Sequence, residues 1–231
     1  MVALTIYDAD ISSLKKRAFD LFCEKVRSCK KEVITIALCG GRFAGEFYKL
    51  LSQLPKDLPL SKLRFFLFDE RMPLSDRNEV MIRESFFDVL VEKNVLSSSQ
   101  LYLIPEGFSL EETARHYTQS LRQVSSSLSF DIIVASMGED GHIASLFPGH
   151  STMRSGELGF GIEPLSPKAP NERLTVLPQS IRQSNTMLLF AVGESKQMAY
   201  TLFLTAKDDK MCPALLVHQV RKGFVFTDLK A

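Results

Sequence analysis

A glycine-rich turn at residues 137–142 holds the two side chains best suited to moving a proton, Asp140 and His142. Histidine titrates near neutral pH, so an imidazole at a strand-to-helix turn is well placed to act as a general base. We expect His142 to be that base and Asp140 to orient its ring. A lone histidine is more often structural, so this interpretation depends on further polar turns at the same edge of a sheet.

A second polar turn, Asp69-Glu70-Arg71, directly follows the apolar stretch at residues 63–68. Two carboxylates beside a guanidinium could orient a sugar hydroxyl or a catalytic group, and Arg71 could bind a phosphate through two parallel hydrogen bonds. A solvated cluster of ion pairs explains the same residues, because surface pairs are common and weak. Taken alone, this turn leaves both interpretations open.

A third turn places Gly40 and Gly41 before Arg42. Two glycines allow the backbone to approach a ligand closely, and the amides that open the next helix favour an anion. A tight turn that needs a positive φ explains the glycine pair equally well.

These turns lie between segments that alternate in character along the chain. The near-continuous apolar strands predict an α/β protein with an open, mostly parallel sheet and helices on both faces. Ligands bind beyond the carboxyl ends of such strands, so we expect the three turns to meet there. The predicted strands are residues 33–38, 63–68, 130–135, 173–177, 186–192 and 223–227, and the predicted helices are residues 10–30, 44–54, 79–92, 110–124 and 194–206.

Residues 149–171 are rich in glycine and proline, which predicts an irregular insert at the edge of the fold. Strand character resumes directly after this segment, so it is not a clean linker between domains. We therefore expect residues 1–231 to form a single domain.

The balance of charge and the lack of long apolar runs exclude several classes of protein. The chain has 28 basic and 27 acidic residues, without the basic excess of a nucleic-acid-binding protein. Its apolar runs fall far short of the ~20 residues that cross a bilayer. The first twenty residues also lack the layout of a signal peptide. We expect no nucleic-acid partner, no membrane partner and a cytoplasmic location.

The cysteines and histidines show no recognised metal-binding spacing. The four cysteines contain no C-x-x-C pair, so we expect reduced thiols. Asp140 and His142 could hold a metal ion, but the other three histidines lie at no ligand spacing to them. The chain also lacks a G-x-S-x-G elbow, a Walker loop and a G-x-G-x-x-G after the first predicted strand. We therefore expect neither a metal nor a cofactor.

Five motifs in order carry a resemblance to a known family. They are a strand with D-E-R (residues 65–71), G-x-D-G-H-x-A-S-L-F-P-G (138–149), E-R-x-T (172–175), G-x-x-K (193–196) and P-A-x-x-V (213–217). With these motifs the sequence resembles the 6-phosphogluconolactonases, in the wider sugar-phosphate isomerase-like group that also holds glucosamine-6-phosphate deaminase. The resemblance covers most of the chain and implies a Rossmann-like α/β fold of the sugar-phosphate isomerase type.

The resemblance implies hydrolysis of 6-phospho-D-glucono-1,5-lactone to 6-phosphogluconate, the second step of the oxidative pentose phosphate pathway, without a metal. The partner would be a small phosphorylated sugar lactone. His142 would activate water, and Arg173 and Lys196 would bind the phosphate with the amides of the glycine pair. Asp69 and Arg71 would line the substrate pocket. Together with the turns above, the expected catalytic residues are His142, Asp140 and Asp69, and the expected substrate-binding residues are Gly40, Gly41, Arg42, Arg71, Gly138, Arg173 and Lys196.

Two stretches depart from the family pattern. The first loop is usually S-G-G-S-T-P, but residues 39–44 read C-G-G-R-F-A, so two hydroxyl donors to phosphate are missing. We hypothesise that Arg42 supplies a charge-assisted contact in their place. The loop after D-E-R, residues 72–78, is shorter than usual, with Arg77 at the serine position and Asn78 at that of the asparagine.

Two alternative functions remain. A 6-phosphosugar deaminase or isomerase on the same fold could use the same histidine turn, although the S-L-F-P-G run and the E-R-x-T motif favour the lactonase. A sugar-phosphate-binding module without turnover is the second, and the altered first loop keeps it open.

The hypothesis for Arg42 predicts a change in substrate affinity. Arg42→Ala should raise KM for the phosphorylated lactone about tenfold, because a hydrogen bond to a charged group contributes roughly 1.5 kcal/mol or more. Steady-state kinetics of lactone hydrolysis measure this, and an unchanged KM would rule out Arg42 as a phosphate ligand.

Overall fold

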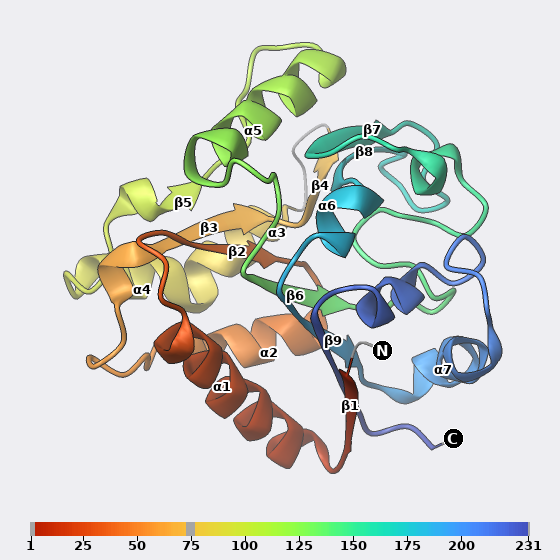
Figure 1. Cartoon of the computed structure of the whole chain (residues 1–231), viewed down its shortest axis with the longest axis horizontal. Coiled ribbons are helices and arrows are strands. Elements are labelled where there is room, and N and C mark those ends of the chain that lie inside the picture. Colours follow the sequence, from red (N-terminus) through yellow and green to blue (C-terminus); the bar gives the residue numbers. More distant parts are fainter. Residues whose placement is uncertain (1–2, 73–76, 231) are drawn as a thin grey trace.

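The computed structural model describes residues 3–72 and 77–230, and its central element is a seven-stranded sheet (Figure 1). Every neighbouring pair of its strands is parallel, in the order β1-β10-β9-β6-β2-β3-β5. The parallel sheet predicted from the apolar segments is therefore confirmed. The strands are β1 (Ala3–Asp8), β2 (Ile34–Leu38), β3 (Leu63–Leu67), β5 (Leu101–Tyr102), β6 (Ile132–Ser136), β9 (Thr186–Ala191) and β10 (Lys222–Thr227).

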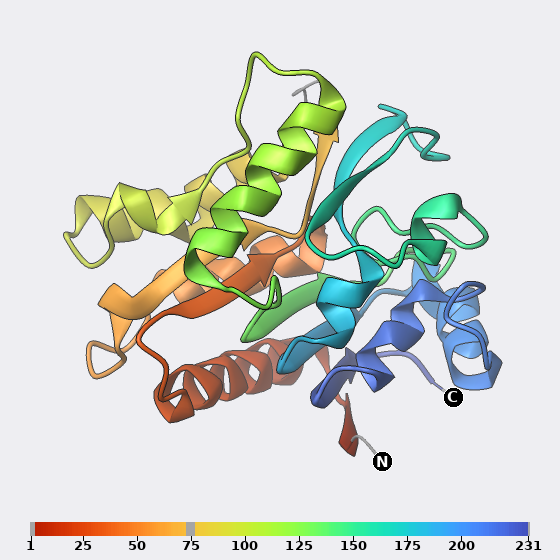
Figure 2. The same ribbon diagram turned by 45° about the horizontal axis from the view of Figure 1, so that its top comes forward.

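Helices cover both faces of this sheet, with α1 and α2 on one side and α5 and α6 on the other (Figures 1 and 2). Asp10 caps α1 by accepting hydrogen bonds from the backbone N–H groups of Ser12 and Ser13. The helices are α1 (Ile11–Ser28), α2 (Arg42–Leu51), α3 (Asn78–Ile82), α4 (Asp88–Glu92), α5 (Leu110–Val124), α6 (Pro178–Arg182) and α7 (Gln197–Thr205), with one π-helical turn (Arg83–Phe87) joining α3 to α4.

Two neighbouring phenylalanines of β3 show why both faces must be covered. Successive side chains of a strand point to opposite faces. Phe65 packs edge-on against Phe86, between α3 and α4, whereas Phe66 packs against Tyr117 of α5. The side chains of Phe65 and Phe66 are both fully buried. The near-continuous apolar run of this strand therefore reflects a sheet that is buried on both sides.

A second sheet of three antiparallel strands lies beyond the end of β3, near α6 (Figure 1). It contains β4 (Asp69–Met72), β8 (Glu172–Val176) and β7 (Phe160–Glu163), in the order β4-β8-β7. Of these strands, the sequence predicted only β8. Most of residues 149–171 is irregular as predicted, but this segment also contains β7.

Phe68 joins the two sheets. Its N–H donates to the carbonyl oxygen of Leu38 in β2 at 2.8 Å, and its own carbonyl accepts from the N–H of Val176, just outside the pairing of β4 with β8, at 3.1 Å. Its side chain is fully buried. The chain therefore passes directly from the large sheet into the small one, and Asp69 follows at the junction.

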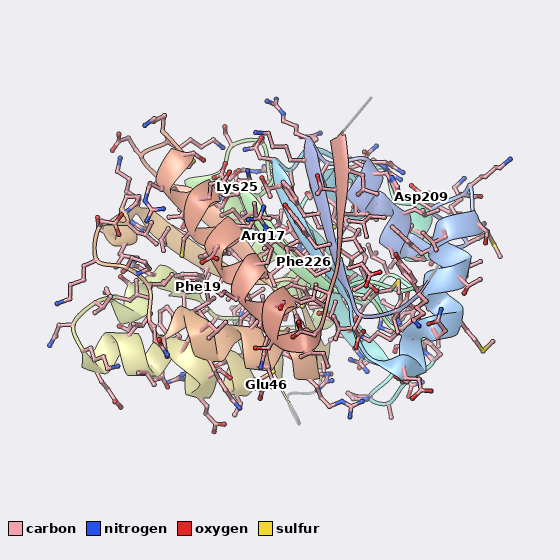
Figure 3. The ribbon with its side chains drawn as sticks, turned by 90° about the horizontal axis from the view of Figure 1, so that it is seen from below. Arg17, Phe19, Lys25, Glu46, Asp209 and Phe226 are labelled. Carbon is pink, nitrogen blue, oxygen red and sulfur yellow. The ribbon has the colours of Figure 1, made fainter. Side chains whose placement is uncertain are left out.

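Figure 3 shows α1 lying across β1 and β10, with Arg17 and Lys25 on its side toward these strands. The guanidinium of Arg17 lies 4.8 Å from the centroid of the Tyr7 ring, and Lys25 Nζ lies 5.2 Å from that of Phe224. Both contacts place a cation over an aromatic ring, which is attractive. They help to hold α1 over the edge of the sheet.

The buried hydroxyl of Tyr117 leads to a test of the packing of α5. It accepts a hydrogen bond from Leu67 N–H at 2.8 Å and donates to the carbonyl oxygen of Tyr102 at 2.9 Å. Tyr117→Phe leaves both backbone groups without this partner and should lower the free energy of unfolding by about 1–3 kcal/mol. Urea denaturation measures the loss. Tyr102→Phe is the control, because the Tyr102 hydroxyl has no hydrogen bond to a described residue, and an equal loss in both variants would contradict the prediction.

Candidate active site

A cleft of about 670 Å³ opens at the carboxyl ends of the strands. After β2 the chain adds β3 and β5 on one side, and after β6 it adds β9 and β10 on the other. Ligands of open α/β sheets bind at such a switch point, where the strand order reverses. The loops that follow β2 and β6 are the glycine pair and the histidine turn. Every predicted site residue lines the cleft except Asp140, which contacts His142. The structure thus brings the three polar turns together.

Asp140 and His142 form a hydrogen-bonded pair at the cleft. The Asp140 carboxylate bonds His142 Nδ1 and also accepts from the His142 backbone N–H at 3.1 Å. Burial raises the pKa of Asp140, but the hydrogen bonds and the charge of His142 outweigh it and lower this pKa to about 2. Asp140 is therefore ionised at neutral pH and stabilises positive charge on the imidazole. Because Nδ1 is occupied, Nε2 is the ring nitrogen left to take a proton.

Gly138 makes room for the histidine ring. A Cβ added to Gly138 would lie 2.0 Å from His142 Cε1, closer than any side chain can approach. The Gly138 N–H donates to the carbonyl oxygen of His142 at 2.8 Å, which closes the turn. The structure therefore shows a packing reason for this glycine, and its predicted contact with substrate stays a prediction.

Asp69 is buried and lies among cations and donors. Its carboxylate accepts from the Ser145 hydroxyl at 2.7 Å, and the side-chain amide of Asn78 donates to its backbone carbonyl at 2.9 Å. Burial raises the pKa of Asp69, while the Ser145 hydrogen bond and the charges of Arg173 and His142 act in the opposite direction. Ser145 follows His142 closely in the chain, so this hydrogen bond links the histidine turn to the small sheet.

Glu70 has a structural place that the sequence did not show. It is 1% exposed, and its carboxylate accepts from the backbone N–H groups of Arg71, Asn78 and Glu79 at 2.9–3.0 Å. These bonds draw the two ends of the loop together. The Glu70 carboxylate is therefore not part of a solvated ion-pair cluster. Of the shortened loop noted in the sequence, residues 73–76 lie outside the described residues.

Arg173 stands opposite Arg71 in the pairing of β4 with β8. Its Nε donates to the carbonyl oxygen of Pro170 at 2.8 Å and its Nη2 to that of Lys168 at 2.9 Å. The guanidinium thus ties residues 168–170 to the rim of the cleft, and Lys168 lines the cleft as well. The predicted role of Arg173 in phosphate binding stays a prediction.

Lys196 and Arg42 both line the cleft, and Arg42 lies where α2 begins. Lys196 Nζ donates to the hydroxyl of Ser136 at 3.0 Å. Burial lowers the pKa of Lys196, and the charge of Arg42 lowers it further. Arg42 is the first residue of α2, and its side chain makes no hydrogen bond or ion pair with a described residue. A cation at this end of a helix opposes the helix dipole, so the site concentrates positive potential.

Three polar residues that line the cleft have no predicted role: Ser136, Ser145 and Lys168. Ser145 lies inside the quoted S-L-F-P-G run, which was its only signal. Ser136 ends an apolar strand and Lys168 lies in the irregular segment, so nothing in the local pattern distinguished them. Among the described residues, no group of three or more histidine, cysteine, aspartate or glutamate side chains is placed to hold a metal ion.

A family model described as "Glucosamine-6-phosphate isomerases/6-phosphogluconolactonase" matches residues 9–226. The chain belongs to this family. It is 34% identical over 229 residues to a 6-phosphogluconolactonase of Borreliella burgdorferi, covering 97% of this chain and 95% of the relative. The structure of a 6-phosphogluconolactonase from Thermotoga maritima superposes with a TM-score of 0.84 at 23% identity, over 99% of this chain and 100% of that one. A monomeric glucosamine-6-phosphate deaminase has the same fold, with a TM-score of 0.80 at 20% identity over 97% of this chain and 96% of that one.

The close approach of Gly138 to the imidazole predicts a specific loss of activity. Gly138→Ala should displace the His142 ring from Asp140 and lower kcat for the reaction of this site at least 100-fold, the scale of one positioned base. Gly156→Ala is the control, because a Cβ at Gly156 meets nothing within 4 Å. Both variants should fold, as circular dichroism can check. Full activity in Gly138→Ala would show that the ring position does not matter.

Proposed function

We infer that this protein hydrolyses 6-phospho-D-glucono-1,5-lactone to 6-phosphogluconate, in the oxidative pentose phosphate pathway. The observation that carries the inference is that His142, hydrogen-bonded to Asp140, lines one cleft with the cations Lys196 and Arg42. The relative in Borreliella burgdorferi, named 6-phosphogluconolactonase and similar over nearly the whole chain, supports the same reaction.

The proposed chemistry needs one base and no covalent intermediate. His142 Nε2 takes a proton from water as the water oxygen attacks C1 of the lactone, and the Asp140 carboxylate stabilises the imidazolium that forms. The C1–O5 bond then breaks, and the departing ring oxygen receives the proton from His142. The product is the open-chain acid, and the imidazole returns to its starting state.

We assign the sugar end of the substrate to the residues around Asp69. Its carboxylate can accept a hydrogen bond from a sugar hydroxyl, and the Arg71 guanidinium can donate to the lactone carbonyl oxygen as negative charge develops there. Both side chains line the cleft with His142. Asp69 is held in place by Ser145, so its orientation is set before substrate arrives.

We assign the 6-phosphate to the region where α2 begins. Lys196 and Arg42 supply charge there, and the amides that follow Gly40 and Gly41 supply directed donors at the positive end of the helix dipole. We assign Arg173 to the same phosphate, in addition to its hydrogen bonds with the carbonyl groups of residues 168–170.

The location of the protein is also a proposal. None of the described helices is long and apolar enough to cross a membrane. The four cysteines are free thiols, which fits a reducing compartment. We propose the cytoplasm, with a phosphorylated sugar lactone as the small-molecule partner and no nucleic-acid or membrane partner.

A lactone assay on two histidine variants tests the proposed function. The wild type should accelerate loss of 6-phosphogluconolactone above spontaneous hydrolysis. His142→Ala should lower kcat about 10²–10⁴-fold yet still bind 6-phosphogluconate in calorimetry. His116→Ala, an exposed histidine of α5 that packs against Phe108, should leave the rate unchanged.

Two companion measurements, ammonia release from glucosamine 6-phosphate and binding of 6-phosphogluconate, test the alternative functions. Ammonia release from glucosamine 6-phosphate, without lactone hydrolysis, would favour the deaminase. Binding of 6-phosphogluconate without turnover of either substrate would favour a sugar-phosphate-binding module. Undiminished turnover in His142→Ala would remove His142 from the mechanism.

A further inference from the structure

Ser136 lies between the half-buried Lys196 of the cleft and the start of α2. It is the last residue of β6, and its hydroxyl accepts the hydrogen bond from Lys196 Nζ at 3.0 Å. A Cβ added to Gly41 would lie 3.4 Å from the Ser136 hydroxyl oxygen and 3.6 Å from its Cβ. Ser136 thus reaches the backbone of the glycine pair from the opposite side of the switch point.

The hydroxyl of Ser136 has an unused donor. A serine hydroxyl can donate one hydrogen bond and accept two. Its contact with Lys196 uses only the oxygen, because an ammonium group has no lone pair. The Ser136 hydroxyl hydrogen has no acceptor among the described residues, and the side chain is half-buried at the cleft. An anion held by Lys196 would supply that acceptor.

The end of α2 beside Ser136 also lacks a capping side chain. Gly41 occupies the N-cap position with φ +111°, and no side chain accepts from the first amides of the helix. Such amides bind anions readily. Gly41 has no Cβ, so the space between these amides and Ser136 stays open.

We propose that Ser136 is a phosphate-binding and specificity-determining residue for this reaction, donating its hydroxyl hydrogen to a phosphate oxygen between Lys196 and the start of α2. The inference rests on the proposed function and deepens it. Ser136 replaces, from β6, a hydroxyl that the family's first loop usually supplies and that residues 39–44 lack. By accepting from Lys196, it also holds the ammonium group toward the same phosphate.

Comparing two lactones isolates this role. Ser136→Ala should raise KM for 6-phosphogluconolactone about five- to tenfold and leave kcat within twofold, because the lost hydrogen bond lies far from the reacting carbon. Hydrolysis of unphosphorylated glucono-1,5-lactone should keep its kcat/KM within twofold. Ser136→Thr restores the hydroxyl and should recover most of the affinity.

Ser145→Ala is the matched control within the cleft. The Ser145 hydroxyl donates to Asp69, whereas the Ser136 hydroxyl accepts from Lys196. Loss of the Ser145 hydroxyl should therefore slow hydrolysis of both lactones by a similar factor. If Ser136→Ala also affects both lactones equally, or neither, Ser136 is no phosphate ligand and the proposal is overturned.

Binding measurements separate this proposal from the proposed function. If the wild type hydrolyses neither lactone, the proposed function fails, but titration of 6-phosphogluconate and inorganic phosphate into wild type and Ser136→Ala still tests the subsite. Weaker binding of both by the variant supports a phosphate contact. Equal binding overturns it.

Discussion

The rest of the site depends on the two backbone hydrogen bonds of Phe68, one to each sheet. Its N–H belongs to the hydrogen bonds of the large sheet and its carbonyl to those of the small one. Asp69 must therefore emerge where the two sheets meet, at the carboxyl edge of the strands. The Ser145 hydroxyl, three residues after His142, donates to Asp69, which fixes the histidine turn relative to the small sheet. The small sheet is thus part of the wall of the cleft.

The electrostatics of the cleft explain how a protein of net charge +1 can bind a phosphate dianion. Lys196 is half-buried, and Arg42 begins a helix at the end where a cation is least favourable. Both positions have a cost that an anion would relieve. At ~4 Å and an effective dielectric near 20, each pair of unit charges gains about 4 kcal/mol before desolvation. Two or three local cations are therefore enough, and the charge of the whole chain matters little.

Much of the local structure could be predicted from the sequence. The predicted helix over residues 110–124 matches α5 (Leu110–Val124), because its apolar spacing and its Ser109 cap are local signals. β1 and β5 were missed, since β1 carries polar residues at an edge and β5 has only two residues. The small sheet was missed because β7 lies within the glycine- and proline-rich segment and β4 contains charged residues. β4 and β7 are strands because they pair with β8, and a pattern of neighbouring residues does not predict that pairing.

By itself, the sequence determined the α/β alternation, the histidine turn with its carboxylate, and the residues that resemble a lactonase. These depend on periodicity and on spacings of a few residues. Only the tertiary structure decided which distant side chains meet: Ser145 with Asp69, 76 residues apart, and Lys196 with Ser136, 60 residues apart. The order of strands in the sheet sets these contacts, and that order follows from packing of the whole chain. For the same reason, the burial of Glu70 could not be foreseen from its charge.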